Sequence, residues 1–178
     1  MSAPASPQPV KLIASVLTAE EDLVPAIGRE LEKRFGEVDF CTEALSFHYT
    51  EYYNAELGTP LIRHMLSFAT LIAPDVLPDI KHATNDIEQQ YLKDNRSRRV
   101  NIDPGYIALH HMILATCKPF SHRPYLAKGI YADMTLLYKG KTFCPLDWTF
   151  PDYRSAELID ILNTVRSVYY RQIHKDCS

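Results

Sequence analysis

The first apolar stretch of the chain, Val10–Leu17, places the strongest constraint on the fold. Its residues are mostly β-branched or otherwise apolar, so hydrophobic side chains fall on both faces of an extended segment. An edge strand or a surface strand would instead alternate between apolar and polar residues. The sequence therefore predicts a strand in the centre of a sheet.

A helix is predicted to follow this strand and to end at Gly36. The apolar positions with helical spacing are Leu23, Ile27, Leu31 and Phe35. Thr18 and Glu21 fit a capping box, which would start the helix at Thr18. Pro25 is awkward inside a helix but acceptable in its first turn, so a start near Asp22 is the alternative.

The elements expected after Gly36 complete an α+β pattern. They are a bulged strand at Val38–Phe47, a strand at Leu61–Ala73, a helix at Pro74–Lys93, a short strand at Arg98–Ile102, a helix or strand at Ile107–Thr116, a hairpin of Ile130–Tyr138 and Thr142–Leu146, and a helix at Ser155–Ile173. The order through Ile102 predicts a ferredoxin-like βαββαβ core, an antiparallel sheet with helices on one face. The hairpin and last helix would extend it. Residues 10–178 form one expected domain, after a disordered tail at residues 1–9.

Composition narrows the functional classes. The 178 residues are 46% hydrophobic, which suits one folded domain. No apolar run approaches the ~20 residues that span a bilayer, and no secretory leader is evident, so we expect a cytoplasmic protein without membrane contact. The four cysteines include no C-x-x-C, which predicts reduced thiols rather than a zinc or redox motif.

Charge is divided unevenly between the two halves of the chain. Residues 1–89 hold 6 Lys or Arg against 14 Asp or Glu, a net charge of −8, whereas residues 90–178 hold 13 against 8, a net charge of +5. The basic half suggests an anionic ligand, and a solvated basic surface is the equally weighted alternative.

Chemically active side chains gather in this second half, between Arg98 and Asp152. The segment Asn101-Ile102-Asp103-Pro104-Gly105-Tyr106 is predicted to leave a strand through a Pro-Gly turn, which would hold Asn101 and Asp103 at the end of the sheet. Asp103 could equally cap that turn.

Two further segments add candidate site residues. His122 titrates near neutrality and precedes Arg123, a permanent cation, which suits anion binding or proton transfer. On the strand that follows, Tyr131, Asp133 and Thr135 share one face, either an exposed surface, which composition favours, or the wall of a pocket. Arg63 lies near the start of the apolar strand Leu61–Ala73 and could line the same pocket.

Two kinds of ligand-binding motif, a phosphate-binding loop and a metal site, are not supported by the sequence. Gly140-Lys141-Thr142 resembles the end of a phosphate-binding loop, but the required earlier glycine is replaced by Thr135 and Phe143-Cys144-Pro145 follows where a helix should start. We interpret it as a hairpin turn. No pair of histidines or cysteines has the spacing of a metal site, so no metal ligand is assigned, although Asp103 and Asp133 could orient a divalent ion.

The same segments carry a resemblance to a known family. They are Pro9–Leu12, Tyr52–Gly58, Asn101–Tyr106, His122-Arg123, Gly129–Leu136 and Trp148–Tyr153. Through them the chain resembles a bacterial family of uncharacterised proteins, a domain of unknown function with some members labelled GTP-binding protein. Asp133 stands where similar sequences have Glu, and Phe150 where they have Tyr. The resemblance implies no established activity, and the absence of a phosphate loop speaks against carrying over the GTP label.

The sequence thus predicts a pocket for a small anionic ligand, such as a nucleotide or another phosphorylated metabolite. In it Arg63, Asn101, Arg123 and Tyr131 would bind the ligand, and His122, Asp103 and Asp133 would be candidate catalytic groups. No cofactor is assigned. The alternative is a non-catalytic interaction or homodimerising module that uses Tyr49, Tyr52 and Tyr53. Nucleic acid is disfavoured because the aromatic pattern of an RNA-binding sheet is missing.

Overall fold

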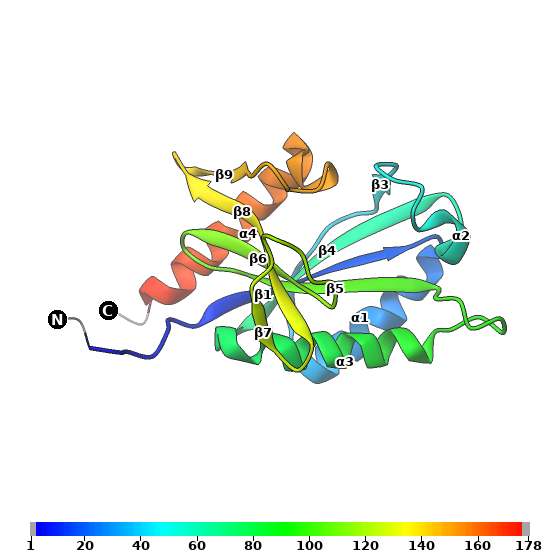
Figure 1. The fold of residues 1–178 in the computed structure, drawn as a ribbon, viewed down its shortest axis with the longest axis horizontal. Coiled ribbons are helices and arrows are strands. Elements are labelled where there is room, and N and C mark those ends of the chain that lie inside the picture. The colour runs from blue at the N-terminus through cyan, green and yellow to red at the C-terminus, as the bar shows by residue number, and fades with distance from the viewer. Residues whose placement is uncertain (1–2, 176–178) are drawn as a thin grey trace.

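The computed structural model describes residues 3–175 and places Val10 in the centre of a large antiparallel sheet. Its strands are β1 (Val10–Thr18), β2 (Val38–Cys41), β3 (Leu45–Phe47), β4 (Leu61–Ile72), β5 (Val100–Ile107), β6 (His111–Thr116), β7 (Tyr125–Ala127), β8 (Ile130–Lys139) and β9 (Thr142–Pro145). Within residues 3–175 the sheet has nine strands in the order β2-β4-β1-β5-β6-β8-β7, with β3 beside β4 and β9 beside β8 (Figure 1). The α+β class with an antiparallel sheet is confirmed, but the sheet is larger than the four strands predicted for the core.

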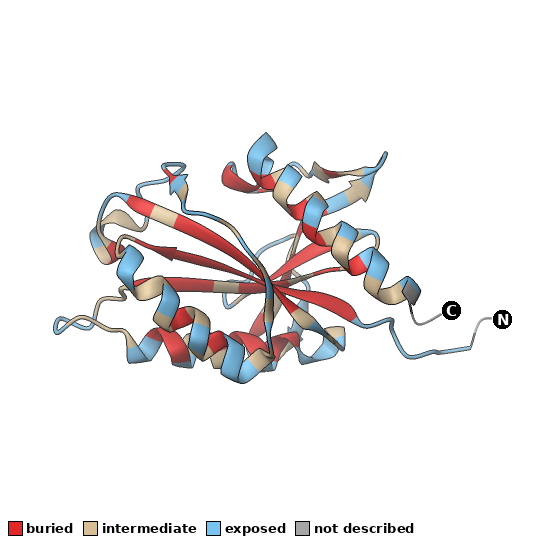
Figure 2. Ribbon diagram, turned by 180° about the vertical axis from the view of Figure 1, so that it is seen from behind, coloured by how far each residue is buried: buried red, intermediate tan, exposed pale blue. Residues whose placement is uncertain are grey.

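Helices cover both faces of the sheet. They are α1 (Val24–Phe35), α2 (Asn54–Leu57), α3 (Leu77–Gln90) and α4 (Ala156–Lys175). Helices α1 and α3 lie along one face and α4 crosses the other (Figure 1). Leu12 and Val16 of β1 pack in the core with α1 and α3, whereas Ile13 packs with α4. The prediction of a central strand is therefore confirmed, and Figure 2 shows buried residues along its length.

The helix boundaries correct two local predictions. Helix α1 begins at Val24 with Pro25 in its first turn, so the later start is right and the capping box at Thr18 is wrong. Thr18 lies in β1, and its hydroxyl donates to the carbonyl of Arg99 at 2.8 Å and accepts the N–H of Glu20. The strand predicted at Val38–Phe47 is divided into β2 and β3, and the ambiguous segment before Thr116 is strand β6.

The turn predicted at Asp103-Pro104-Gly105 is wrong, because all three residues lie inside β5. Pro104 pairs with Ala14 of β1, and pairing with β6 begins only at the next residue, Gly105. Gly105 allows β5 and β6 to pack closely and does not form a turn. A Cβ built on it would lie 2.2 Å from the carbonyl oxygen of Ile113, so β6 can approach β5 only beside a glycine.

The ends of the chain add little to the fold. Residues 3–9 of the predicted tail are exposed and form no helix or strand, and residues 1–2 lie outside the described part. Cys41, Cys117 and Cys144 are free thiols, and Cys177 lies outside the described residues. No helix in residues 3–175 is long and apolar enough to cross a membrane.

Candidate functional site

The site is a cleft where β5 and β6 diverge. Strand β5 pairs with β1 over its full length but with β6 only from Gly105 to Ile107. Within the described chain, the first half of β5 therefore has no neighbouring strand on that side. Side chains on the face that α4 covers elsewhere, including those of Asp103 and Leu114, line two adjoining cavities there.

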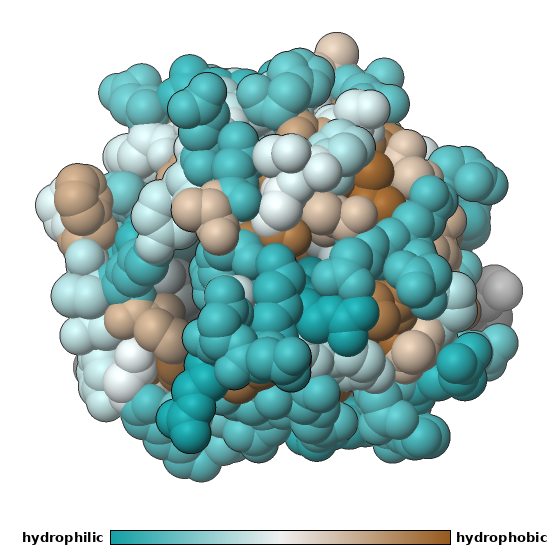
Figure 3. Space-filling view, turned by 90° about the vertical axis from the view of Figure 1, so that its right-hand side faces the viewer, coloured by the Kyte–Doolittle hydropathy of each residue, from teal (hydrophilic) through white to brown (hydrophobic). Residues whose placement is uncertain are grey.

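The larger cavity, here called the aromatic chamber, has a volume of about 490 Å³. Its lining includes six aromatic residues, among them Phe47, Tyr53 and Tyr153, and the buried ion pair of Arg63 and Asp152. The volume is in the range of small-molecule sites. Figure 3 faces the end of the molecule that carries α2 and shows a hydrophilic surface with apolar atoms in its recesses.

The smaller cavity, here called the cationic chamber, has a volume of about 250 Å³. The charged side chains that line it are Lys81, Arg98, Lys118, Arg123, Asp103 and Asp133. Four cations face two carboxylates in this lining, but Arg98 is also paired with Glu56 and Glu88. Lys118 is therefore the cation of this chamber that has no carboxylate partner within residues 3–175, and it favours an anionic group. The aromatic chamber has a balanced lining, because Arg63 and Lys118 face Asp103 and Asp152.

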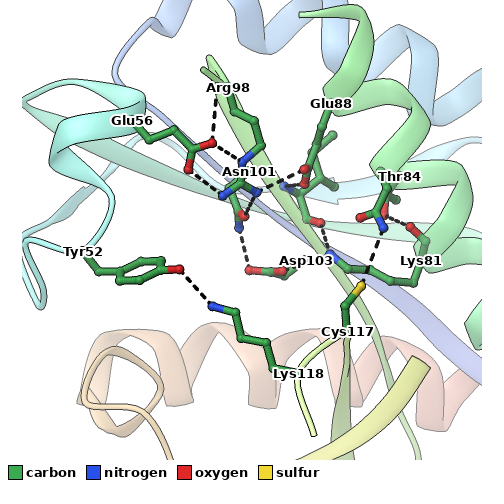
Figure 4. A network of polar contacts seen from close by, with 12 residues as sticks. Tyr52, Glu56, Lys81, Thr84, Glu88, Arg98, Asn101, Asp103, Cys117 and Lys118 are labelled. Atoms are coloured by element: carbon green, nitrogen blue, oxygen red, sulfur yellow. Dashed lines mark hydrogen bonds and ion pairs between the residues drawn. The ribbon is translucent and has the colours of Figure 1, made fainter. Parts of the chain in front are cut away.

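Asp103 lies between the two chambers and lines both of them. The other shared residues are Tyr52, Tyr53, Leu114, Lys118 and Phe150. Both oxygens of the Asp103 carboxylate are held: Oδ1 accepts from Lys81 Nζ at 3.2 Å and Oδ2 accepts from Asn101 Nδ2 at 2.7 Å (Figure 4). The carboxylate is therefore fixed in place before any ligand arrives.

Arg98 joins Asn101 to the carboxylates of Glu56 and Glu88 in one hydrogen-bonded network. Arg98 donates to both oxygens of Glu56 at 2.7 and 2.8 Å, and its Nη1 also donates to Asn101 Oδ1 at 2.7 Å and to Glu88 at 3.2 Å (Figure 4). The hydrogen bonds from Arg98 lower the pKa of Glu56. Burial raises the pKa of Glu88, although the Ile102 N–H donates to it at 2.6 Å.

Lys118 points toward Tyr52 across the cleft. Its ammonium donates to the Tyr52 hydroxyl at 3.1 Å and lies 4.7 Å from the centre of that ring (Figure 4). Arg123 Nη1 donates to the backbone carbonyl of Lys118 at 3.2 Å and so holds this residue in position. Neighbouring Tyr53 is partly buried, and its pKa is raised to about 12 by burial and by the negative charge of Asp103.

Asp133 is buried, so the expectation that its face of the strand is exposed is wrong. Only 4% of Asp133 and none of Thr135 is accessible. Arg123 Nε donates to Asp133 Oδ2 at 2.8 Å, and His122 Nε2 lies 3.7 Å from the same oxygen. Asp103, Arg123 and Asp133, three of the predicted site residues, all line the cationic chamber.

The remaining predicted site residues are placed less centrally. His122 lines neither chamber and stacks on Trp148, with ring centres 5.0 Å apart. Tyr131 also lies outside both chambers and packs edge-on against Tyr125. Arg63 does line the aromatic chamber, where its guanidinium is bound to Asp152.

Sequence reasoning missed Lys81, Lys118, Asp152 and Phe150 as members of the site. A signal for Lys81 is present in the sequence, because this charged residue follows Ile80 on the apolar stripe of α3 and is 6% exposed. Glu88 lies on the same stripe and is also buried. A charged residue on the core face of a helix requires a partner, which here is the polar edge of β5.

The described residues offer no ready metal site, since no group of three His, Cys, Asp or Glu side chains is close enough to hold an ion. Asp103 and Asp133 instead bond to Lys81, Asn101 and Arg123. An organic ligand fits this donor set better than a bare cation.

Comparison with known proteins agrees with the resemblance seen in the sequence. Residues 8–169 match the model of a domain of unknown function, DUF4416. The chain belongs to this family. The DUF4416 match extends from just before β1 into α4 and so includes both chambers. No curated protein and no solved structure matches this DUF4416 chain.

Proposed function

We propose that the protein binds a small anionic ligand, a nucleotide or another phosphorylated metabolite, across the two chambers. The flat or apolar part of the ligand would pack in the aromatic chamber, and its anionic group would enter the cationic chamber. The chambers share Asp103 and Lys118, so one molecule can occupy both.

The observation that carries this proposal is the bonding of Lys118. Among the cations that line the chambers, Lys81, Arg98, Arg123 and Arg63 each have a carboxylate partner within residues 3–175. The ammonium of Lys118 donates only to the neutral hydroxyl of Tyr52 in this part of the chain. A phosphate could therefore replace a weak neutral partner rather than compete with a carboxylate.

The other predicted site residues take supporting roles in the proposal. Arg123 would place Lys118 through its backbone carbonyl and share the anion, and Asn101 would hold Asp103. Asp103 would orient hydroxyl groups of the ligand between the chambers. Arg63 would shape the aromatic chamber, and His122 with Asp133 would hold the Arg123 loop.

The test is calorimetric titration of the protein with inorganic phosphate, pyrophosphate and adenosine 5′-monophosphate. We expect binding by wild type and at least a tenfold loss in Lys118→Gln, because the ion pair with the ligand is removed. Lys141→Gln is the matched control, since Lys141 is an exposed lysine in the β8–β9 turn and lines neither chamber. Equal binding by Lys118→Gln and wild type would contradict the proposal, as would no binding by wild type.

A second candidate is the interaction or homodimerising module. Several aromatic side chains are exposed near the chambers, led by Phe120 at 65% and Tyr52 at 63%. Exposed aromatic residues are enriched in protein interfaces. Light scattering after size exclusion separates the two ideas: a dimer that dissociates in Tyr52→Ala supports this candidate, and a monomer at all concentrations excludes the homodimer.

We further propose that β1, β2, β4 and β5 with α1 and α3 form a ferredoxin-like unit. The order β2-β4-β1-β5 and the antiparallel pairing of these neighbours support it, with α1 following β1 and α3 following β4. An experimental structure in which β5 does not pair with β1 would contradict this topology.

A further inference from the structure

The ion pair in the aromatic chamber is bonded through one contact only. Arg63 Nη2 donates to Asp152 Oδ2 at 2.5 Å, and the two side chains are each 9% exposed. The guanidinium carbon lies 4.8 Å from the ring centre of Phe47 and 5.0 Å from that of Tyr153. Arginine and carboxylate commonly form two parallel hydrogen bonds, so this pair leaves bonding capacity unused.

The unused positions are an acceptor and a donor. Asp152 Oδ1 accepts no hydrogen bond from residues 3–175, and Arg63 Nε is buried without a partner. Buried polar atoms are almost always bonded, so the unpartnered Arg63 Nε beside a cavity indicates a place for a ligand or water. Asp152 Oδ1 is not one of these fully buried atoms, and it adds an accessible acceptor to the same place. Both residues line the aromatic chamber.

Asp152 differs in this respect from Asp103, the other carboxylate of the chamber. Both oxygens of Asp103 already accept from Lys81 and Asn101. Asp152 Oδ1 is therefore the carboxylate oxygen of this chamber that accepts no hydrogen bond within residues 3–175. The side chains around it are largely aromatic. A hydrogen-bond donor suits that position, whereas a carbonyl or a second carboxylate would set two acceptors against each other.

We infer that the aromatic chamber selects a flat ring that carries an N–H donor, and that this donor binds Asp152 Oδ1. The faces of the ring pack against the surrounding aromatic side chains, and the anionic group of the same ligand reaches Lys118. This inference rests on the proposed function and adds the chemistry of the ring. Sites that hydrogen-bond a particular ligand group discriminate strongly against analogues that lack it.

Four nucleoside 5′-monophosphates test the inference on the wild-type protein. They are those of purine riboside, adenosine, inosine and guanosine, which share ribose and phosphate. The purine base of purine riboside carries no N–H, whereas adenine carries an amino group, hypoxanthine a ring N–H, and guanine both. We expect at least one of these three to bind ten times more tightly than purine riboside 5′-monophosphate.

Substitution at Asp152 identifies the acceptor. Asp152→Asn should reduce the tenfold preference to less than threefold, because Arg63 would keep the amide oxygen as its acceptor and the amide NH2 would face the N–H of the ligand. Asp103→Asn is the matched control and should weaken all four compounds to the same extent, leaving the preference intact. If Asp152→Asn does not fold, the comparison on wild type decides alone.

The outcomes separate this inference from the proposal on which it rests. Similar affinity of all four monophosphates, with inorganic phosphate also bound, would overturn the ring inference and leave the anion site standing. No binding of any monophosphate, phosphate or pyrophosphate would overturn both. A preference that persists in Asp152→Asn would also overturn the assignment to Asp152.

Discussion

Arg123 Nε donates to Asp133 Oδ2 at 2.8 Å and joins the loop after β6 to the middle of β8. The two side chains are 11% and 5% exposed. The imidazole Nε2 of His122 lies 3.7 Å from the same oxygen. Arg123 is therefore the main partner of a buried negative charge, in addition to lining the cationic chamber.

Replacing Arg123 should consequently destabilise the protein even without ligand. Removing one member of a buried ion pair costs about 3 to 5 kcal/mol, because the remaining charge stays desolvated. We expect Arg123→Ala to lower the free energy of unfolding by about 3 kcal/mol in urea titrations. Lys118→Gln, at an exposed position, should change it by less than about 0.5 kcal/mol. Equal stability of Arg123→Ala and wild type would show that the pair is not formed in solution.

Gly105 lies where β5 and β6 begin to pair, at the closed end of the cleft between them. A Cβ there would lie 2.2 Å from the Ile113 carbonyl oxygen and 2.9 Å from the Leu114 side chain. We expect Gly105→Ala to cost about 3 kcal/mol or more, because β5 and β6 must separate. Gly28→Ala, in α1 with no atom within 4 Å of the added Cβ, should instead stabilise by about 1 kcal/mol. Thermal and urea unfolding of both variants measure the contrast, and a similar small effect in each would refute the close packing at Gly105.

The error at Gly105 shows what local sequence can and cannot predict. Helical spacing located α1, α3 and α4, and the apolar character of β1 predicted its central place, because these signals are local. Pro104 and Gly105 have the residue types of a turn, but their role depends on Ile113, whose approach no local pattern reveals. Tertiary packing overrides the local preference in such cases.

The candidate site, like the fold, could be predicted only in part from the sequence. Asp103 was identified as part of a predicted Pro-Gly turn and Asp133 as a carboxylate in the middle of a predicted strand, and both line the cationic chamber. Lys118 was missed because its importance comes from the carboxylates bonded to the other cations, and those pairings join residues far apart in sequence. The pairing of Arg63 with Asp152, which are 89 positions apart, is of this kind.

Lys11 lies on the face of the sheet that α4 covers, toward the end of β1 that is farther from the chambers. Its side chain is 0% exposed, and its ammonium bonds to Asp39 of β2 and to Gln172 of α4 at 2.9 Å. We expect Lys11→Ala to destabilise by about 3 kcal/mol, because Asp39 loses its partner and the stem leaves a cavity. Lys11→Met keeps the stem and should cost less. Urea unfolding of the two variants separates the packing from the charge, and a larger loss in Lys11→Met would contradict this division.

Tyr53 should make stability depend on pH in the alkaline range. Burial, together with the charge of Asp103, raises its pKa to about 12 from the ordinary value of 10.0, so the folded protein favours the neutral phenol. A raised pKa contributes stability that is complete below pH 10 and is lost as the pH rises toward 12, with a slope of up to about 1.4 kcal/mol per pH unit. In Tyr53→Phe this slope should be smaller than in wild type, as measured by urea unfolding between pH 9 and 12. Tyr170→Phe removes an exposed hydroxyl from α4 and serves as the control. Parallel curves for wild type and Tyr53→Phe would show that Tyr53 ionises as readily in the folded state as in the unfolded state.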